Sequence, residues 1–467
     1  MHHAARTGSD KNAMPKLVEG SLILGVVLAV LAFGGVESVS FAIVQLIFLG
    51  TAAALVVRGG RKAAPFCWQA FLVPTLLISV VLVQLCPLPA SWLARFAGRE
   101  NLVAGIGPNC WTIELHSTQT QFLILVTCLI AFYLAQLVSL DREPKRRLIV
   151  SVIGLGTFEA FYGLVQYLSG WQKIFTYTKK YDLEEATGTY INRNHYAGLL
   201  EMVLPFGVAL ILYEYGKLRG DDRQPAKSVT KMMQRRTFQR FVLCLCVAVV
   251  LFAALLFSRS RMGIIAACAS MLAIFGLAVI SRSQAKAGLV LFAIFGALSL
   301  TLAIWIGPGP ILSRFENVRQ EYTIHDQSRL SIWRDALGLI ERHPLLGTGL
   351  GTFPIAYTSV QTAFLGQFVN HAHNDYVELA SGLGLPAALI LFASFFFVLA
   401  RAVRTFRCSV GNFDRAVALG CVGSLVAILL HSLTDFNLYM PANALMFSVV
   451  LGLGISTQRR NSEFRSE

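Results

Sequence analysis

The chain has 467 residues, of which 55% are hydrophobic and only 14% are charged, and its mean hydropathy is +0.60. A soluble domain has about 45–50% apolar and about 25% charged residues, so this composition excludes a soluble globular protein and indicates a polytopic membrane protein. The net charge of +14 has the sign expected for nucleic-acid binding, but lysine and arginine also collect in the cytoplasmic loops of membrane proteins.

Apolar runs that are long enough to cross a bilayer recur along the whole chain. A helix needs about 20 mainly apolar residues to span the hydrocarbon core. The sequence therefore predicts an all-α membrane protein with about 12 transmembrane helices. The predicted spans are residues 17–35, 38–57, 64–86, 119–140, 147–168, 194–214, 241–258, 262–281, 287–306, 377–400, 415–433 and 440–456.

The polar segments between these runs predict the topology. Residues 1–16 are polar and basic, and no cleavage site follows the first apolar run, so we interpret that run as a retained helix and not as a signal peptide. With the N-terminus inside, about two thirds of the 40 lysine and arginine residues lie in cytoplasmic segments. Residues 1–16 and 457–467 are then both cytoplasmic tails, and topology explains the basic charge without a nucleic-acid partner.

One expected outer segment is much longer than the others. Residues 307–376 lie between the ninth and tenth predicted helices and are expected to form a large folded periplasmic loop. This loop divides the membrane region into residues 17–306 and 377–456. Long ordered loops tend to be functional, so the loop is the first place to look for a site.

The middle of this loop has the spacing of an amphipathic helix. Leu330, Trp333, Leu337 and Ile340 follow one another at intervals of three or four residues, with arginines around them. We predict that these four side chains form an apolar stripe on a helix, and that the loop is a folded cap over the membrane domain.

A cluster of polar side chains marks the start of the tenth predicted helix, in the stretch NHAHNDYVE at residues 370–378. His373 is predicted to lie on this helix, on the same face as Gly384, with His371 on another side. Imidazole titrates near neutral pH, so His373 could take a proton from a hydroxyl group. Two other interpretations stay open: an interfacial histidine satisfied by water or backbone, and a metal site made by His371, His373 and Asp375.

Two pairs of arginines are candidates for binding phosphate on the same side of the membrane. Arg259 and Arg261 lie at an expected outer turn, and Arg329 and Arg334 lie in the loop helix. Guanidinium groups match phosphate oxygens bidentately and keep their charge when partly desolvated. The alternatives are snorkelling to lipid head groups for the first pair and a solvated helix face for the second. Together with a histidine, these cations suit a pyrophosphate-bearing substrate.

Further polar residues are expected at the same outer surface. Glu201 lies inside the sixth predicted helix, and an intramembrane carboxylate is either functional or paired with a neighbouring helix. Four residues are expected to support the site: Asn374, Asn194, His195 and Asp435.

Several segments together resemble the O-antigen ligase/polymerase superfamily, over about residues 20–455 of the chain. These segments are FGGVES, QLCPLP, YGLVQYLSG, NRNHYAGLLEM, SRSRMGI, RLSIWRDA, GTGLGTF and HNDYVELASGLG. The most specific is His373-Asn374 with Gly384 after it, which resembles the histidine–asparagine/serine–x9–glycine motif at the end of the large periplasmic loop of the ligases. The chain departs from the ligases' arginine-x3-leucine pattern, because Arg329 is followed at that spacing by Trp333.

The resemblance implies a glycosyltransferase that works at the periplasmic face of the bacterial inner (cytoplasmic) membrane. Its donor would be a glycan on undecaprenyl pyrophosphate, and its acceptor a hydroxyl of lipid A–core or of another glycan. By resemblance His373 is the base, and the cations that hold the pyrophosphate are Arg261 or Arg259 and Arg329 or Arg334. No cofactor or metal ion is expected, because the donor is already activated and the arginines neutralise the leaving group. A single displacement would invert the anomeric carbon.

Three functions are compatible with these features. The first is an O-antigen ligase of lipopolysaccharide biosynthesis. The second is an O-antigen or exopolysaccharide polymerase of the cell envelope, for which a chain-length regulator would be a further partner. The third is a transporter of a lipid or solute, but a transporter is expected to have internal repeats and charges near the bilayer midplane, whereas these polar groups gather at the outer rim.

Overall fold

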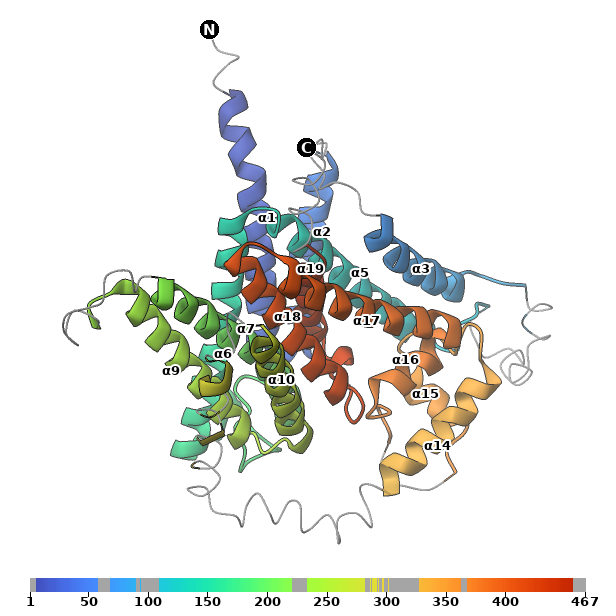
Figure 1. The fold of residues 1–467 in the computed structure, drawn as a ribbon. Coiled ribbons are helices and arrows are strands. Elements are labelled where there is room, and N and C mark those ends of the chain that lie inside the picture. Colours follow the sequence, from blue (N-terminus) through green and yellow to red (C-terminus); the bar gives the residue numbers. More distant parts are fainter. Residues whose placement is uncertain are drawn as a thin grey trace.

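The computed structural model describes residues 6–57, 68–89, 109–220, 233–281, 327–362 and 368–456, together with residue 93 and a few positions between 286 and 301. Helices dominate the described residues (Figure 1). A two-stranded antiparallel hairpin, β1 (Lys173–Ile174) with β2 (Tyr177–Thr178), interrupts them after the helix that ends at Ser169.

Nine of the helices that the structure describes are long and apolar enough to cross a membrane. This finding confirms the expected class, an all-α polytopic membrane protein. The nine are α1 (Arg6–Leu31), α2 (Ser38–Val57), α5 (Leu115–Val138), α6 (Arg142–Ser169), α7 (Arg193–Gly220), α9 (Arg236–Phe257), α10 (Arg261–Ile280), α17 (Leu385–Cys408) and α18 (Asn412–His431).

Two shorter apolar helices coincide with further predicted spans. They are α3 (Trp68–Leu85) and α19 (Pro441–Ser456). The ninth predicted span, residues 287–306, falls mostly outside the described residues.

The helix α7 forms the centre of the bundle. In the apolar stretch of α7, 94% of the residues are buried inside the protein, against 22% in α2. Side chains of α2 such as Leu46 and Val56 are exposed. A helix that is apolar all round is buried by its neighbours, and α7 packs against α18, α9 and α10. The polar groups at the end of α7 are therefore enclosed by protein and not by lipid.

Ion pairs join the ends of several helices on the side where the sequence predicts the cytoplasm. Lys145 at the start of α6 lies 2.9 Å from Asp414 at the start of α18. Two residues further along α6, the Arg147 guanidinium donates a hydrogen bond to the Glu19 carboxylate of α1 at 2.7 Å. The residues of α1, α6 and α18 that the sequence predicts at the cytoplasmic side thus lie close together.

Three short helices make a cap at the opposite side of the bundle, beside one end of α17 (Figure 1). They are α14 (Gln327–Arg342), α15 (Phe353–Tyr357) and α16 (Asp375–Leu383). A small apolar core joins the cap, and its buried members include Ile332, Ala336, Leu339, Phe353 and Tyr357.

The cap helix α14 confirms the predicted helix and only half of the predicted stripe. Ile340 is buried and Trp333 packs against the cap core, but Leu330 and Leu337 are each 54% exposed. Ile332, Ala336 and Leu339 complete the buried face. Both sets repeat at three or four residues, so periodicity alone could not choose the buried face. The contact that orients α14 comes from another segment, because the indole nitrogen of Trp333 donates to the Ala372 carbonyl at 2.8 Å.

The tenth predicted span is two helices and not one. The chain breaks at Gly384, between α16 and α17, where φ is +82° and ψ is 158°. Asn374 caps α16 by accepting hydrogen bonds from the N–H groups of Tyr376 (3.0 Å) and Val377 (3.2 Å). His373 therefore precedes the helix, and the expected helical face shared by His373 and Gly384 is wrong.

Replacing Gly384 by alanine is expected to destabilise the cap. Its backbone lies in a region that is essentially restricted to glycine, at a cost on the order of 1–3 kcal/mol for other residues. A Cβ would also lie 2.3 Å from the Leu345 carbonyl oxygen. Thermal unfolding of detergent-purified protein should show a lower midpoint for Gly384→Ala, but not for Gly154→Ala, since no atom lies within 4 Å of a Cβ at Gly154 in α6. Equal midpoints for Gly384→Ala and the unaltered protein would contradict this reading of the break.

Candidate active site

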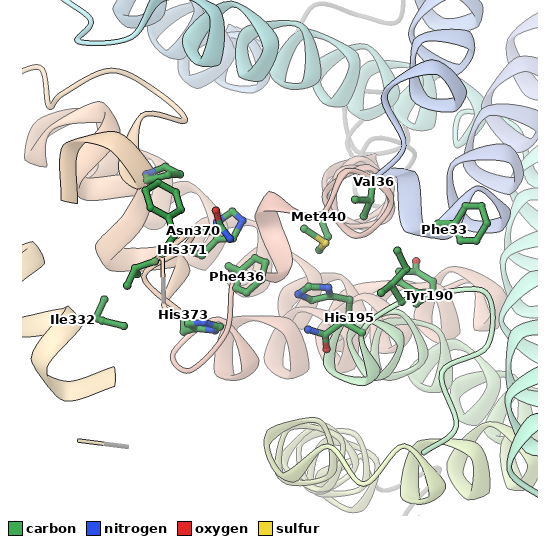
Figure 2. Close-up of a pocket in the computed structure, with 15 residues that line it drawn as sticks. Phe33, Val36, Tyr190, His195, Ile332, Asn370, His371, His373, Phe436 and Met440 are labelled. Atoms are coloured by element: carbon green, nitrogen blue, oxygen red, sulfur yellow. The ribbon is translucent and has the colours of Figure 1, made fainter. Parts of the chain in front are cut away.

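A cavity of about 500 Å³ opens where the cap meets one end of the bundle. Its walls are mainly apolar, and three imidazoles interrupt them: His195, His371 and His373. Figure 2 shows the Phe436 ring between His371 and His373 on one side and His195 on the other. The remaining lining residues are Phe33, Val36, Tyr190, Ile191, Asn192, Ile332, Pro354, Phe368, Val369, Asn370 and Met440.

The Phe436 ring packs against all three imidazoles. Its centroid lies 3.9 Å from that of His371, which stacks on it at 11°, and 4.7 and 5.1 Å from His195 and His373, which meet it edge to face. A single ring in the connection between α18 and α19 thus holds the three side chains in one wall.

His373 is held in a strained backbone conformation at the cavity. Its φ of +49° is uncommon for a residue with a side chain, and such strain persists only where surrounding contacts fix it. On either side the chain is tied down, by the bond from Trp333 to the Ala372 carbonyl and by the Asn374 cap. The imidazole remains 37% exposed. Trp333, which replaces the leucine of the ligase pattern, therefore positions the backbone beside His373.

His371 faces the same cavity. Its Nδ1 lies 2.8 Å from Oε1 of Glu378, and the other oxygen of Glu378 accepts the Ala372 N–H at 2.8 Å. The expectation that His371 lies on another side from His373 is therefore wrong, because both precede α16 and both line the cavity.

The Asp435 carboxylate is surrounded by histidines. Its Oδ1 lies 3.7 Å from His373 Nδ1 and 3.8 Å from His195 Nε2, and its Oδ2 lies 3.9 Å from His431 Nε2. The side chain is only 2% exposed. Burial alone would raise the pKa of Asp435, but the neighbouring His195, His373 and His431 hold that pKa well below its ordinary value. Asp435 is therefore an anion that faces the buried side of the His373 ring.

A second buried carboxyl group, Asp375, anchors the connection that carries Asp435. It accepts the Ser432 hydroxyl at 2.7 Å and the Leu438 N–H at 3.2 Å, and its own N–H donates to the Ser432 carbonyl at 2.9 Å. Burial raises the pKa of Asp375 well above its ordinary value. These bonds hold the start of α16 beside the connection between α18 and α19.

Arg329 is the predicted arginine that the structure brings to this connection. Its guanidinium on α14 donates to the Thr434 carbonyl at 3.2 Å, next to Asp435. Arg334 is exposed on the same helix. In the other pair, Arg259 has a φ of +52°. Its guanidinium lies 3.4 Å from the Glu184 carboxylate and 3.4 Å from the Tyr167 hydroxyl. Arg261 is half-buried at the start of α10.

The two predicted asparagines lie at the starts of helices. Asn374 is the cap of α16, and Asn194 lies half-buried in the first turn of α7, where its N–H donates to Asn192 Oδ1 at 2.7 Å. His195, on the next position of α7, reaches Asp435 as described above. Among the described residues no three His, Cys, Asp or Glu side chains are grouped closely enough to hold a metal ion.

Sequence patterns missed the roles of Phe436, which lines the cavity, and of His431 and Trp333, which contact the residues around it. Trp333 was predicted only as part of an apolar stripe, since an aromatic or a histidine beside an apolar run is ordinary in a membrane protein. A signal for one of them was present, because His431 and Asp435 are four residues apart at the end of a predicted helix.

Comparison with known proteins agrees with the resemblance seen in the sequence. Residues 246–392 match the family model described as O-Antigen ligase, a stretch that begins in α9 and ends in α17. It includes both arginine pairs, the cap and His373. No curated protein matches the chain. The family match and the membrane-spanning helices together support the resemblance to the O-antigen ligase/polymerase superfamily.

Proposed function

We propose that this protein transfers a glycan from undecaprenyl pyrophosphate to an acceptor hydroxyl at the periplasmic face of the inner membrane, as an O-antigen ligase-like enzyme. The family consists of membrane glycosyltransferases that use lipid-linked glycans. The observation that carries the proposal is the His373 imidazole, which is exposed to the cavity on one side and faces the buried Asp435 carboxylate on the other.

In the proposed reaction His373 is the general base. Because Nδ1 of His373 faces Asp435, its Nε2 is the ring nitrogen that is available to the cavity. This Nε2 accepts the proton of the acceptor hydroxyl. The hydroxyl oxygen forms a bond to the anomeric carbon as the bond from that carbon to the pyrophosphate oxygen breaks. The electron pair leaves with the pyrophosphate, and the anomeric carbon is inverted. Asp435 orients the ring and stabilises the imidazolium that forms.

Arginines neutralise the charge that grows on the leaving pyrophosphate. Arg329 is supported in this role by its bond to the Thr434 carbonyl, which uses one of its five donors and holds the guanidinium on the connection that carries Asp435. Arg261 is the second candidate. Arg259 is engaged by Glu184 and Tyr167, and Arg334 is exposed, so both are weaker candidates. Arginine charge also makes a metal ion unnecessary for this step.

Replacing Arg329 by lysine should slow transfer on the order of tenfold or more, because lysine keeps the charge but loses the planar fork that matches phosphate. The measurement is the transfer rate of purified protein in proteoliposomes. Arg342→Lys, at the exposed end of the same helix, should transfer at the unaltered rate. If Arg329→Lys is as fast as the unaltered protein, or if Arg334→Lys is equally slow, the assignment of Arg329 is wrong.

The proposed topology puts both tails in the cytoplasm and residues 307–376 in the periplasm. It is supported by the Lys145–Asp414 and Arg147–Glu19 pairs, which join helix ends at the side away from the cavity. The acceptor decides between the members of the superfamily. A ligase takes lipid A–core, whereas an O-antigen or exopolysaccharide polymerase takes another lipid-linked repeat and can work with a chain-length regulator.

A deletion strain tests the proposal and separates these acceptors. Accumulated long polymer on undecaprenyl pyrophosphate indicates a ligase, lipopolysaccharide with a single repeat indicates an O-antigen polymerase, and loss of unlinked polysaccharide indicates an exopolysaccharide polymerase. The phenotype should be reversed by the unaltered gene but not by His373→Ala. A deletion strain with normal surface glycans and no accumulated lipid-linked glycan would contradict the proposed function.

A further inference from the structure

A second carboxylate–imidazole pair lies beneath Asp435, inside the bundle. His431 at the end of α18 places Nδ1 at 3.1 and 3.0 Å from the two oxygens of Glu201 in α7. Both side chains are fully buried. A buried carboxylate at membrane depth is costly unless a cation or hydrogen-bond donor compensates for it, and His431 is the donor here.

The other edge of the His431 ring faces the proposed site. Its Nε2 lies 3.9 Å from Asp435 Oδ2, and neither atom has a hydrogen-bond partner among the residues that the structure describes. A lone pair on Nε2 would repel the carboxylate, whereas an N–H would attract it. A ring that carries a proton on both nitrogens therefore donates to Glu201 and attracts Asp435 at the same time.

The two oxygens of Asp435 have different neighbours. Oδ1 faces His373 and His195, and it also accepts the Phe436 N–H at 2.9 Å. The approach of His431 to the carboxylate is to Oδ2, at 3.9 Å. The Arg329 guanidinium is bonded to the carbonyl of Thr434, the residue before Asp435. His431 is thus placed at the oxygen whose position fixes the rotation of the carboxylate, and with it the way Oδ1 meets the His373 ring.

On the basis of the proposed function, we infer that Glu201 and His431 are positioning residues for glycan transfer. Glu201 holds His431 as a cation, and His431 holds Asp435 Oδ2 so that Oδ1 faces His373. Neither residue touches the substrate, and no proton has to leave the Glu201–His431 pair during a turnover. The pair supplies a fixed charge behind the base, in a part of the bundle that water does not reach.

The test uses Glu201→Gln, which keeps the shape of the side chain, and the double variant Glu201→Gln/His431→Gln, which removes both charges without leaving one unpaired. The matched control is Ser424→Ala, because Ser424 on α18 donates to the Met202 carbonyl on α7 and thus belongs to the same buried helix contact. Each variant is reconstituted in proteoliposomes with the lipid-linked glycan extracted from the deletion strain. Transfer rate and affinity for undecaprenyl pyrophosphate are measured separately.

Both Gln variants should transfer roughly 10- to 100-fold more slowly, because a misoriented base loses part of its catalytic contribution, while their affinity for undecaprenyl pyrophosphate stays unchanged. Ser424→Ala should keep the unaltered rate. The inference is overturned if the Gln variants transfer at the unaltered rate, or if their loss of rate is matched by loss of folded protein or of lipid affinity.

His373→Ala, measured in parallel, separates this inference from the proposed function. An inactive His373→Ala beside fully active Gln variants leaves the proposed function in place and removes only the positioning role. An active His373→Ala removes His373 as the base and the positioning role with it, whereas a deletion strain with normal glycans overturns the proposed function itself.

Discussion

His373→Ala is expected to reduce glycan transfer by roughly 10²- to 10⁴-fold, the usual contribution of a general base. The ring is exposed to the cavity and makes no hydrogen bond through Nδ1 among the described residues, so its removal leaves the surrounding packing largely intact. The measurement is the amount of transferred glycan in the deletion strain that carries the variant, normalised to the amount of protein in the membrane.

The matched control for this variant is His116→Ala, in which an exposed imidazole at the start of α5, outside the cavity lining, is removed. It should restore transfer completely. Full transfer by His373→Ala at equal protein level would remove His373 from the mechanism, whatever its position in the cavity.

Asp435→Asn is expected to have the second largest effect, a loss of up to about 10⁴-fold, by analogy with the aspartate that orients the histidine of a catalytic triad. Asparagine keeps an oxygen for the Phe436 N–H, but it removes the anion that faces His373, His195 and His431. The measurement is the transfer rate of purified protein, together with the midpoint of thermal unfolding.

Asp414→Asn is the control for this carboxylate, because it breaks the ion pair with Lys145 at the side away from the cavity. Its transfer rate per folded protein should equal that of the unaltered chain. If Asp435→Asn folds and transfers normally, Asp435 does not orient the base.

The membrane bundle could be predicted from sequence because hydropathy and length report it directly. The expected spans at 38–57 and 262–281 coincide with α2 and α10 to within a residue. The break at Gly384 was harder to see, since the residues around it continue an apolar run. The cap residue Asn374, with Asp375 and Glu378 in the first turn, was the local sign that a helix starts after His373.

The candidate site was predictable only in part, because its members come from distant segments. The sequence selected His373, His195 and Asp435, and the structure brings each of the two histidines within 4 Å of Asp435. It could not select His431 as the partner of Glu201, since the two are 230 positions apart and meet only through the packing of α7 on α18. Nor could it separate Arg329 from Arg334, because only the bond to Thr434 distinguishes them.

Electron cryomicroscopy of the protein with bound undecaprenyl pyrophosphate tests the central claim most directly. We expect the pyrophosphate at the mouth of the cavity, within hydrogen-bonding distance of the Arg329 guanidinium and on the side of His373 that faces away from Asp435. A pyrophosphate bound elsewhere, with neither Arg329 nor His373 near it, would contradict the proposed active site.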